Sequence, residues 1–243
     1  SNPECLWLPG NGAADDYPRE KGKGAVSMER GICLILGYVC GLLQTGYIYG
    51  KIHGIDIRQY GSGNSGTTNA LRVLGKKAGL IVFIGDAFKA LIPCLLVRAF
   101  CLGRPELTGE AYLLVLYLGF GVILGHNFPF YMNFKGGKGI AATAGVLASL
   151  DWRLTLICLV IFVGSVALTR YVSLGSILVA AAFFAVNLIF SWKGMYGLTP
   201  FARVVEFWGV AGAVSAMAIW RHRANIKRLL AGNENKLWGN KKV

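Results

Sequence analysis

Residues 78–101 read AGLIVFIGDAFKALIPCLLVRAFC, a nearly continuous apolar segment. The segment is longer than the roughly 20 residues that a helix needs to cross a bilayer. Six further apolar runs occur in the chain, at 31–50, 111–125, 140–150, 154–168, 174–192 and 204–220. Of the 243 residues, 54% are hydrophobic and 15% are charged, whereas soluble domains carry about 25% charged residues. These patterns predict an all-α membrane protein with seven transmembrane helices.

The short run 140–150 leaves a second topology open. One bent helix over 140–168, interrupted at 151–153, would give six crossings instead of seven. With seven crossings, one side holds fifteen Lys and Arg residues, in loops 51–77, 126–139 and 169–173 and in the tail from Arg221; the short loops opposite hold five. The positive-inside rule then places the C-terminus in the cytoplasm and the N-terminus outside. Because seven crossings also gather the polar motifs on one face, we favour seven.

Composition limits the domain organisation and the partners. Residues 1–27 are polar, and we expect a disordered leader or a non-native extension there, followed by a single membrane domain over 28–243. The net charge of +13 lies in juxtamembrane loops without a nucleic-acid-binding motif, which favours the lipid bilayer and anionic substrates as partners over nucleic acid. The six cysteines form no CxxC pair, so no metal site and no cofactor are expected.

The first polar block, residues 61–72, reads GSGNSGTTNALR and lies between two apolar runs. Its glycines allow backbone N–H groups to converge on an oxyanion, Ser62 offers a hydroxyl, and Arg72 can hold a phosphate in two places. It is not a nucleotide-binding P-loop, because Gly66 is followed by Thr67 and not by Lys. The alternative is a flexible connector, which would need neither the asparagines nor the arginine.

The second polar block, residues 125–143, reads GHNFPFYMNFKGGKGIAAT. Gly136, Gly137, Lys138 and Gly139 open a short predicted helix, and backbone donors at a helix N-terminus beside a Lys form a second anion site. An acyl tail could lie along the apolar helix that follows. In the alternative interpretation, Lys138 is a simple positive-inside anchor.

The third polar block begins the tail, where His222 and Asn225 share one face of a predicted helix. The nearby Arg223, Lys227 and Arg228 are expected to meet lipid phosphates.

Two further polar pairs lie at the apolar runs. Within run 78–101, Asp86 and Lys89 either face a partner or a cavity, as ionisable groups in a membrane helix usually do, or form an intrahelical ion pair, which we favour. Ser173 and Ser176 either donate to a substrate phosphate or cap the helix that they begin.

Taken together, the three blocks resemble the three cytoplasmic motifs of the bacterial acyl-phosphate-dependent glycerol-3-phosphate acyltransferase family, PlsY. The resemblance covers residues 28–236. The matching residues are Gly61, Ser62, Gly63, Asn64, Gly66, Thr68, Asn69, Arg72, Gly125, His126, Phe128, Pro129, Phe134, Lys135, Gly136, Gly137, Lys138, Gly139, Arg221, His222, Arg223, Asn225, Ile226, Gly232 and Glu234.

The resemblance implies a multi-pass enzyme of the bacterial inner membrane with its active site in the cytoplasm. Such an enzyme moves an acyl group from acyl phosphate to the sn-1 hydroxyl of glycerol 3-phosphate, giving lysophosphatidic acid and phosphate. A soluble phosphate acyltransferase that makes acyl phosphate is an expected partner.

The resemblance also implies the site residues. The expected catalytic residues are Ser62, Arg72, Lys138, His222 and Asn225. The expected substrate-binding residues are Gly61, Gly63, Asn64, Thr68, Asn69, His126, Gly136, Gly137, Gly139, Thr143, Ser173, Ser176 and Glu234.

The residues themselves agree with chemistry of this kind. A mixed anhydride has a good leaving group, so holding two phosphates and aligning a hydroxyl can supply much of the catalysis. No His is followed five residues later by the Asp of a CoA-type acyltransferase dyad. The competing hypotheses are an anion transporter, which would place polar groups near the bilayer midplane, and a lipid-binding scaffold, which would leave the glycine-rich blocks unexplained.

Overall fold

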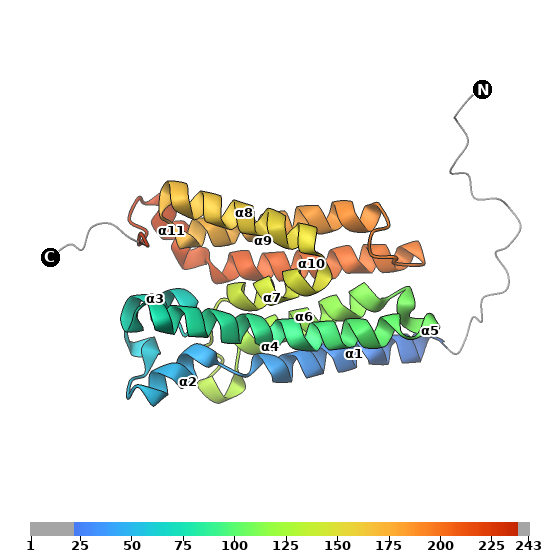
Figure 1. Ribbon diagram of the computed structural model, residues 1–243, viewed down its shortest axis with the longest axis horizontal. Helices are drawn as coiled ribbons and strands as arrows, with labels where there is room; N and C mark the ends of the chain where they lie inside the picture. Colours follow the sequence, from blue (N-terminus) through green and yellow to red (C-terminus); the bar gives the residue numbers. More distant parts are fainter. Residues whose placement is uncertain (1–21, 238–243) are drawn as a thin grey trace, which may run out of the picture.

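The computed structural model describes residues 22–237, and all regular elements in that range are helical (Figure 1). The α-helices are α1 (Gly22–Gly41), α2 (Thr45–Ile52), α3 (Thr67–Leu74), α4 (Lys76–Leu102), α5 (Pro105–Thr108), α6 (Ala111–Asn127), α7 (Ile140–Leu150), α8 (Trp152–Thr169), α9 (Val172–Trp192), α10 (Phe201–Arg221) and α11 (Arg223–Leu230). Two short 3-10 helices, η1 (Ile57–Gln59) and η2 (Phe130–Met132), lie in the connecting loops. The predicted leader 1–27 lies mostly outside the described residues, although α1 already begins at Gly22.

The long helices form two layers, with α7 between them (Figure 1). Helices α8, α9 and α10 make one layer, and α1, α4 and α6 make the other. The short helices α3 and α11 lie at one end of the molecule, and α5 lies at the opposite end with the start of α1. The three polar blocks of the sequence therefore belong to the same end.

Six segments in the described part of the chain are long and apolar enough to cross a membrane. They are 28–52, 76–102, 111–132, 152–169, 172–192 and 201–221. Helix α7, with 11 residues, is apolar but shorter than these spans.

Helices α7 and α8 are separate, so the alternative of one bent helix over 140–168 is wrong. Asp151 between them has an extended backbone (φ −156°, ψ 135°), and its side chain accepts a hydrogen bond from the Arg153 N–H at 2.7 Å. This contact is a typical N-cap, because the carboxylate satisfies an N–H of the first turn of α8. The chain reverses direction at this point (Figure 1).

Glycines allow α1 and α6 to pack backbone against backbone. Gly37 and Gly41 of α1 face Gly121 and Gly125 of α6, and the spacing of four places each pair on one face of its helix. A Cβ at Gly125 would lie 2.1 Å from the carbonyl oxygen of Tyr38, closer than any real contact. Gly125, the first residue of the second polar block, therefore packs against Gly41, beside the break between α1 and α2.

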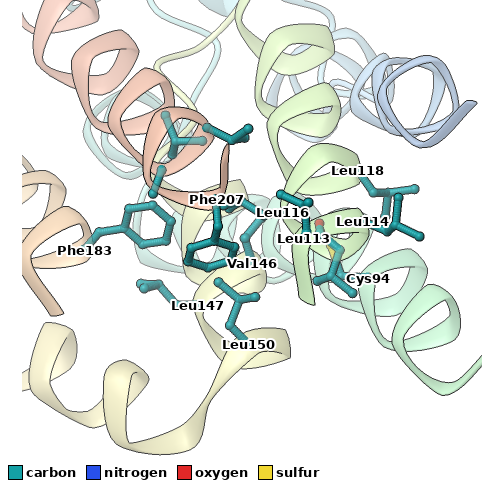
Figure 2. Packing of buried hydrophobic residues seen from close by; sticks show 14 of the residues in the cluster. Cys94, Leu113, Leu114, Leu116, Leu118, Val146, Leu147, Leu150, Phe183 and Phe207 are labelled. Carbon is teal, nitrogen blue, oxygen red and sulfur yellow. The ribbon is translucent and has the colours of Figure 1, made fainter. Parts of the chain in front are cut away.

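Helix α6 forms the centre of the apolar core (Figure 2). Its Leu113 and Leu116 are fully buried, as are Phe183 of α9 and Phe207 of α10. Helix α7 closes the core with Val146, and it approaches α4 closely at Gly145, where a Cβ would lie 2.1 Å from a backbone oxygen of α4. This packing fixes the position of α7, and with it the loop that precedes it.

Candidate active site

A cavity of about 190 Å³ lies where the three polar blocks meet. All five expected catalytic residues line it, together with eight of the expected substrate-binding residues. The predicted residues in the wall are Ser62, Arg72, Lys138, His222, Asn225, Asn64, Thr68, Asn69, His126, Gly139, Ser173, Ser176 and Glu234. The expected residues outside the wall are Gly61, Gly63, Gly136, Gly137 and Thr143.

Three helix N-termini contribute their first turns to the wall. They belong to α3, α7 and α9, and they present Thr68, Ile140 and Ser173 respectively. The N-terminal end of a helix carries a partial positive charge and N–H groups without intrahelical partners. Their convergence therefore makes the cavity suited to anions.

The loop before α3 is shaped by Asn69, which is buried. Its Oδ1 accepts a hydrogen bond from the Ser62 N–H at 2.8 Å, and its Nδ2 donates to two backbone carbonyls near η1, both at 3.0 Å. Gly61 has a φ of +61°, and a Cβ there would lie 2.3 Å from Asn69 Oδ1. Asn64 accepts from the Gly66 N–H at 2.8 Å. The loop is thus held in shape by its asparagines, and Ser62 is positioned by them.

A chain of hydrogen bonds fixes Lys138 against the third block. Lys138 Nζ donates to Asn225 Oδ1, and Asn225 Nδ2 donates to Glu234 Oε1 at 2.9 Å. The other Glu234 oxygen accepts from Arg228 Nε at 2.8 Å. We expected Arg228 to meet lipid phosphates, but it lines the cavity and pairs with Glu234. The sequence pattern could not distinguish the two roles, because Glu234 lies beyond the helix that carries Arg228.

Burial lowers the pKa of Lys138 to about 8, and the positive charges of Arg228, Arg221 and Arg72 act in the same direction. Glu234 opposes them, with a smaller effect than burial. A bound anion would relieve this repulsion, because it would add the negative charge that the site lacks.

Two cations of the cavity wall are available for anions. Arg228 is paired with Glu234, and the Asp86 carboxylate is paired with Lys89. Within residues 22–237, neither Arg72 nor Lys138 has a carboxylate within 4.0 Å. Arg72 Nη2 makes a long contact of 3.4 Å with the carbonyl of Asn235.

His222 is a neutral hydrogen-bond acceptor in this geometry. Its Nδ1 lies 2.7 Å from the carbonyl oxygen of Ala218, so Nδ1 carries the proton and Nε2 keeps a lone pair. Burial, followed by the charge of Lys138, lowers the pKa of His222 to about 4. The imidazole is therefore uncharged at neutral pH.

Gly136 and Gly137 hold the loop and do not face the cavity. Their N–H groups donate to the carbonyls of Asn127 and His126, each at 3.1 Å, so these donors are already occupied. A Cβ at Gly137 would lie 1.9 Å from His126 Nε2. At this block, the first turn of α7 faces the cavity, so the expected anion contact would be made there and not by Gly136 and Gly137. Thr143 donates to the carbonyl of Gly139 at 2.9 Å, a contact within the same turn.

Arg221 holds this loop from its other side. Its Nη2 donates to the carbonyl oxygens of Gly136 and Gly137, at 3.1 and 2.6 Å. The guanidinium also lies over the Phe128 ring, 5.2 Å from its centroid. The loop that carries Lys138 is therefore fixed between α6 and the end of α10.

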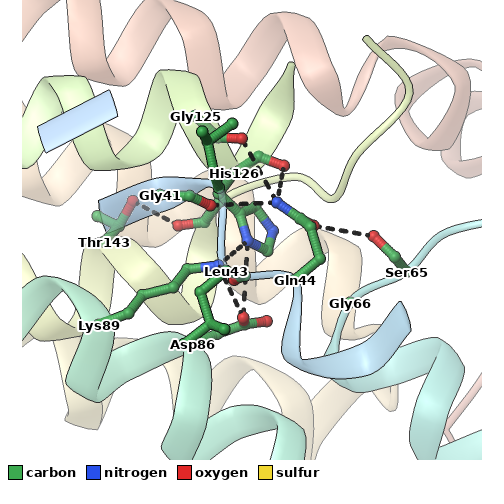
Figure 3. A network of polar contacts seen from close by, with 12 residues as sticks. Gly41, Leu43, Gln44, Ser65, Gly66, Asp86, Lys89, Gly125, His126 and Thr143 are labelled. Carbon is green, nitrogen blue, oxygen red and sulfur yellow. Dashed lines mark hydrogen bonds and ion pairs between the residues drawn. The ribbon is translucent and has the colours of Figure 1, made fainter. Parts of the chain in front are cut away.

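The predicted Asp86–Lys89 ion pair is confirmed, with 2.9 Å between Lys89 Nζ and Asp86 Oδ1 (Figure 3). Lys89 Nζ also contacts the Leu43 carbonyl at 2.5 Å and His126 Nδ1 at 2.8 Å. Sequence reasoning missed these two contacts, and it favoured the ion pair over a cavity position, whereas Asp86 both forms the pair and lies in the cavity wall. The available signal was the presence of a buried ionisable pair within an apolar run, which is typical of a functional position.

An apolar portion completes the wall. It is formed by Phe83, Ile140, Ala141, Phe162 and Val172, which were not predicted as site residues. Among the residues that the structure describes, no group of three or more His, Cys, Asp or Glu side chains could hold a metal ion. The cavity thus combines an anion-binding part with an apolar part.

Comparison with known proteins places this geometry in a family. A family model described as glycerol-3-phosphate acyltransferase matches residues 31–232. The chain is 41% identical over 213 residues to the glycerol-3-phosphate acyltransferase of Clostridioides difficile (strain 630), covering 87% of this chain and 96% of the relative. It is also 41% identical over 204 residues to that of Thermoanaerobacter sp. (strain X514), covering 84% and 93% respectively.

The fold is similar to a solved structure with a TM-score of 0.72 and 34% sequence identity. That structure is the glycerol 3-phosphate form of PlsY (YgiH), described as an integral membrane glycerol 3-phosphate acyltransferase, and the match covers 86% of this chain and 96% of the PlsY chain. The long apolar helices and this likeness identify a multi-pass integral membrane protein. With the family match over most of its length, the chain belongs to the glycerol-3-phosphate acyltransferase family.

Proposed function

We propose that the protein transfers a fatty acyl group from acyl phosphate to the sn-1 hydroxyl of glycerol 3-phosphate. The products are 1-acyl-glycerol 3-phosphate and inorganic phosphate. The observation that carries the proposal is that Arg72 and Lys138, two cations without a carboxylate partner among residues 22–237, lie in one cavity that also has an apolar wall. Two phosphates and one acyl chain are the groups that such a cavity would hold.

The two cations suit the two substrates differently. Arg72 lies in the last turn of α3, and its planar guanidinium can grip the phosphate of glycerol 3-phosphate in two places. Lys138 lies beside the N-terminus of α7 and near the apolar residues Ile140 and Phe162, which favours the acyl phosphate. The acyl chain would then leave the cavity along the apolar wall.

The reaction needs little chemistry from the protein. The sn-1 hydroxyl attacks the acyl carbon, the bond between that carbon and the bridging oxygen breaks, and phosphate leaves with the bridging oxygen. Holding both substrates in line can supply roughly 7–11 kcal/mol. The proton goes to a phosphate oxygen of the substrate or to His222 Nε2, which is a neutral acceptor.

The proposed arrangement in the membrane has seven crossings, with α7 as the short fourth crossing. The end that holds α3 and α11 would face the cytoplasm of a bacterial cell, and the start of α1 would lie outside the inner membrane. This orientation follows from the excess of Lys and Arg at that end. A soluble phosphate acyltransferase would then deliver acyl phosphate from the same side.

The test is a comparison of acyl donors with the purified protein in lipid nanodiscs. Glycerol 3-phosphate is offered with palmitoyl phosphate, palmitoyl-CoA or palmitoyl-acyl carrier protein, and the position of the acyl chain in the product is determined by NMR. We expect product from palmitoyl phosphate alone, with the chain at sn-1. Equal use of palmitoyl-CoA would contradict the proposed donor, and a chain at sn-2 would contradict the proposed acceptor hydroxyl.

A further inference from the structure

The Asp86 carboxylate contains a buried oxygen without a partner. Asp86 is only 1% exposed, and its Oδ2 has no hydrogen-bond partner among the described residues. Leaving a buried acceptor of this kind unsatisfied costs free energy, more so when the group is charged. Since Asp86 lines the cavity, a ligand in the cavity can supply the missing donor.

The surrounding network fixes which oxygen remains available. Lys89 Nζ has three contacts, to Asp86 Oδ1, to His126 Nδ1 and to the carbonyl of Leu43, at 2.9, 2.8 and 2.5 Å. An ammonium has three N–H donors, so all are used, and Oδ1 is held toward Lys89. Figure 3 shows Oδ2 directed away from this network. The carboxylate therefore cannot rotate without breaking the ion pair.

The other strong acceptors of the cavity wall are occupied. Both Glu234 oxygens accept, one from Asn225 and one from Arg228. The Asn225 oxygen accepts from Lys138, and the oxygens of Asn64 and Asn69 accept from backbone N–H groups of their own loop. Among the carboxylate, amide and imidazole acceptors of the wall, Asp86 Oδ2 and His222 Nε2 remain for substrate donors. The wall hydroxyls of Thr67 and Ser173 also have no partner among the described residues, but a hydroxyl donates as well as accepts, whereas a carboxylate only accepts.

Glycerol 3-phosphate carries two hydroxyl donors, whereas the cavity wall offers mainly donors and cations and few acceptors without a partner. The hydroxyl that attacks must release its proton, whereas the sn-2 hydroxyl keeps its own throughout the reaction and needs a permanent acceptor. A carboxylate already neutralised by Lys89 is suited to that lasting hydrogen bond. Resting on the proposed function, we propose that Asp86 Oδ2 binds the sn-2 hydroxyl of glycerol 3-phosphate and so determines acceptor specificity.

The test is a cycle of one side-chain change and one substrate change. The substrate change is 3-hydroxypropyl phosphate, which retains the phosphate and the attacking hydroxyl but lacks the sn-2 hydroxyl. The side-chain change is Asp86→Asn, which keeps the shape and the Oδ1 contact with Lys89 but replaces the acceptor Oδ2 with a donor. Dissociation constants come from calorimetry without acyl donor, and kcat/KM comes from turnover with palmitoyl phosphate.

We expect the wild-type protein to bind 3-hydroxypropyl phosphate about tenfold or more weakly than glycerol 3-phosphate, as for a hydrogen bond to a charged acceptor. In Asp86→Asn this preference should fall to about threefold or less, since the hydroxyl has lost its acceptor. The matched control is Asp151→Asn, at the junction of α7 and α8 outside the cavity wall, which should keep the full preference.

The outcomes separate the inference from the proposed function. If the wild-type protein binds both acceptors equally, the inference is wrong, and this arm needs no variant. If Asp86→Asn folds, judged by its elution and melting temperature, and keeps the wild-type preference, the inference is also wrong. Should Asp86→Asn fail to fold, Asp86→Asn with Lys89→Met removes both charges of the pair and carries the same test. Absence of turnover in the wild-type protein, with the binding preference intact, would contradict the proposed function alone.

Discussion

The pH dependence of acyl-phosphate use should report the titration of Lys138. The pKa of this buried ammonium is lowered to about 8, and the proposed anion contact requires its charged form. Lys138 is then roughly nine-tenths protonated at pH 7 and roughly one-tenth protonated at pH 9. Because the charge is lost as the pH rises through 8, kcat/KM for palmitoyl phosphate should fall roughly tenfold between pH 7 and pH 9.

Other groups should contribute little to this change. The pKa of His222 is about 4, so its imidazole is neutral over the whole interval. Phosphate monoesters lose their second proton near a pKa of about 6, so the acceptor is already a dianion at pH 7. The matched variant is Lys138→Arg, whose guanidinium stays charged above pH 9.

The assay measures phosphate release with palmitoyl phosphate and glycerol 3-phosphate both well below their KM values, so that the rate reports the ligand-free site. A blank without protein at each pH subtracts spontaneous hydrolysis. We expect Lys138→Arg to be slower than the wild-type protein but flat between pH 7 and pH 9. A flat wild-type profile would remove Lys138 from donor binding. An equal fall in Lys138→Arg would assign the titration to another group.

Three further predictions concern the acceptor site, the packing and the topology. Arg72→Lys should lower kcat/KM for glycerol 3-phosphate roughly tenfold to a hundredfold, because an ammonium cannot reproduce the bidentate grip. Arg58→Lys, outside the cavity wall, should have little effect. If Arg72→Lys has the kinetics of the wild-type protein, Arg72 is excluded from the site. Gly125→Ala should lower the free energy of unfolding by about 1–3 kcal/mol, because its Cβ would meet the α1 backbone. Gly209→Ala, with open space around its Cβ, should not lower it. Denaturation in detergent compares the two variants, and equal stability would contradict the close α1–α6 packing. A cysteine in place of Lys51 should react with an impermeant reagent only from the cytoplasm, and one in place of Glu106 only from outside. Reaction of both from one side would contradict the crossing of α4, and exchanged sides would contradict the proposed orientation.

The apolar pattern was sufficient to predict most helices. Run 140–150 coincides with α7, and run 78–101 lies within α4 (Lys76–Leu102). The pattern did not predict the break between α1 and α2 or the short helix α3, because these depend on contacts with distant parts of the chain. Gln44, for example, which follows α1, donates to the carbonyl of His126 in α6 at 3.1 Å.

The sequence predicted which residues form the site, but not the hydrogen bonds between them. Residue types and spacing indicated two anion-binding blocks, and their expected catalytic residues lie in one cavity wall. The same pattern could not show that the N–H groups of Gly136 and Gly137 are occupied by α6, or that Lys89 reaches His126. Both facts follow from how α4 and α6 pack, and helical periodicity carries no information about the partner of a buried polar group.

The decisive measurement is the balance of products from palmitoyl phosphate and glycerol 3-phosphate with the purified protein in nanodiscs. Lysophosphatidic acid is measured by mass spectrometry and inorganic phosphate by a coupled assay in the same samples, with the Lys138→Met variant as the inactive reference. Acyl transfer predicts that both products appear at the same rate, one for one, and that both depend on glycerol 3-phosphate. Phosphate release without lysophosphatidic acid, or equal rates in Lys138→Met, would contradict an acyltransferase reaction in this cavity.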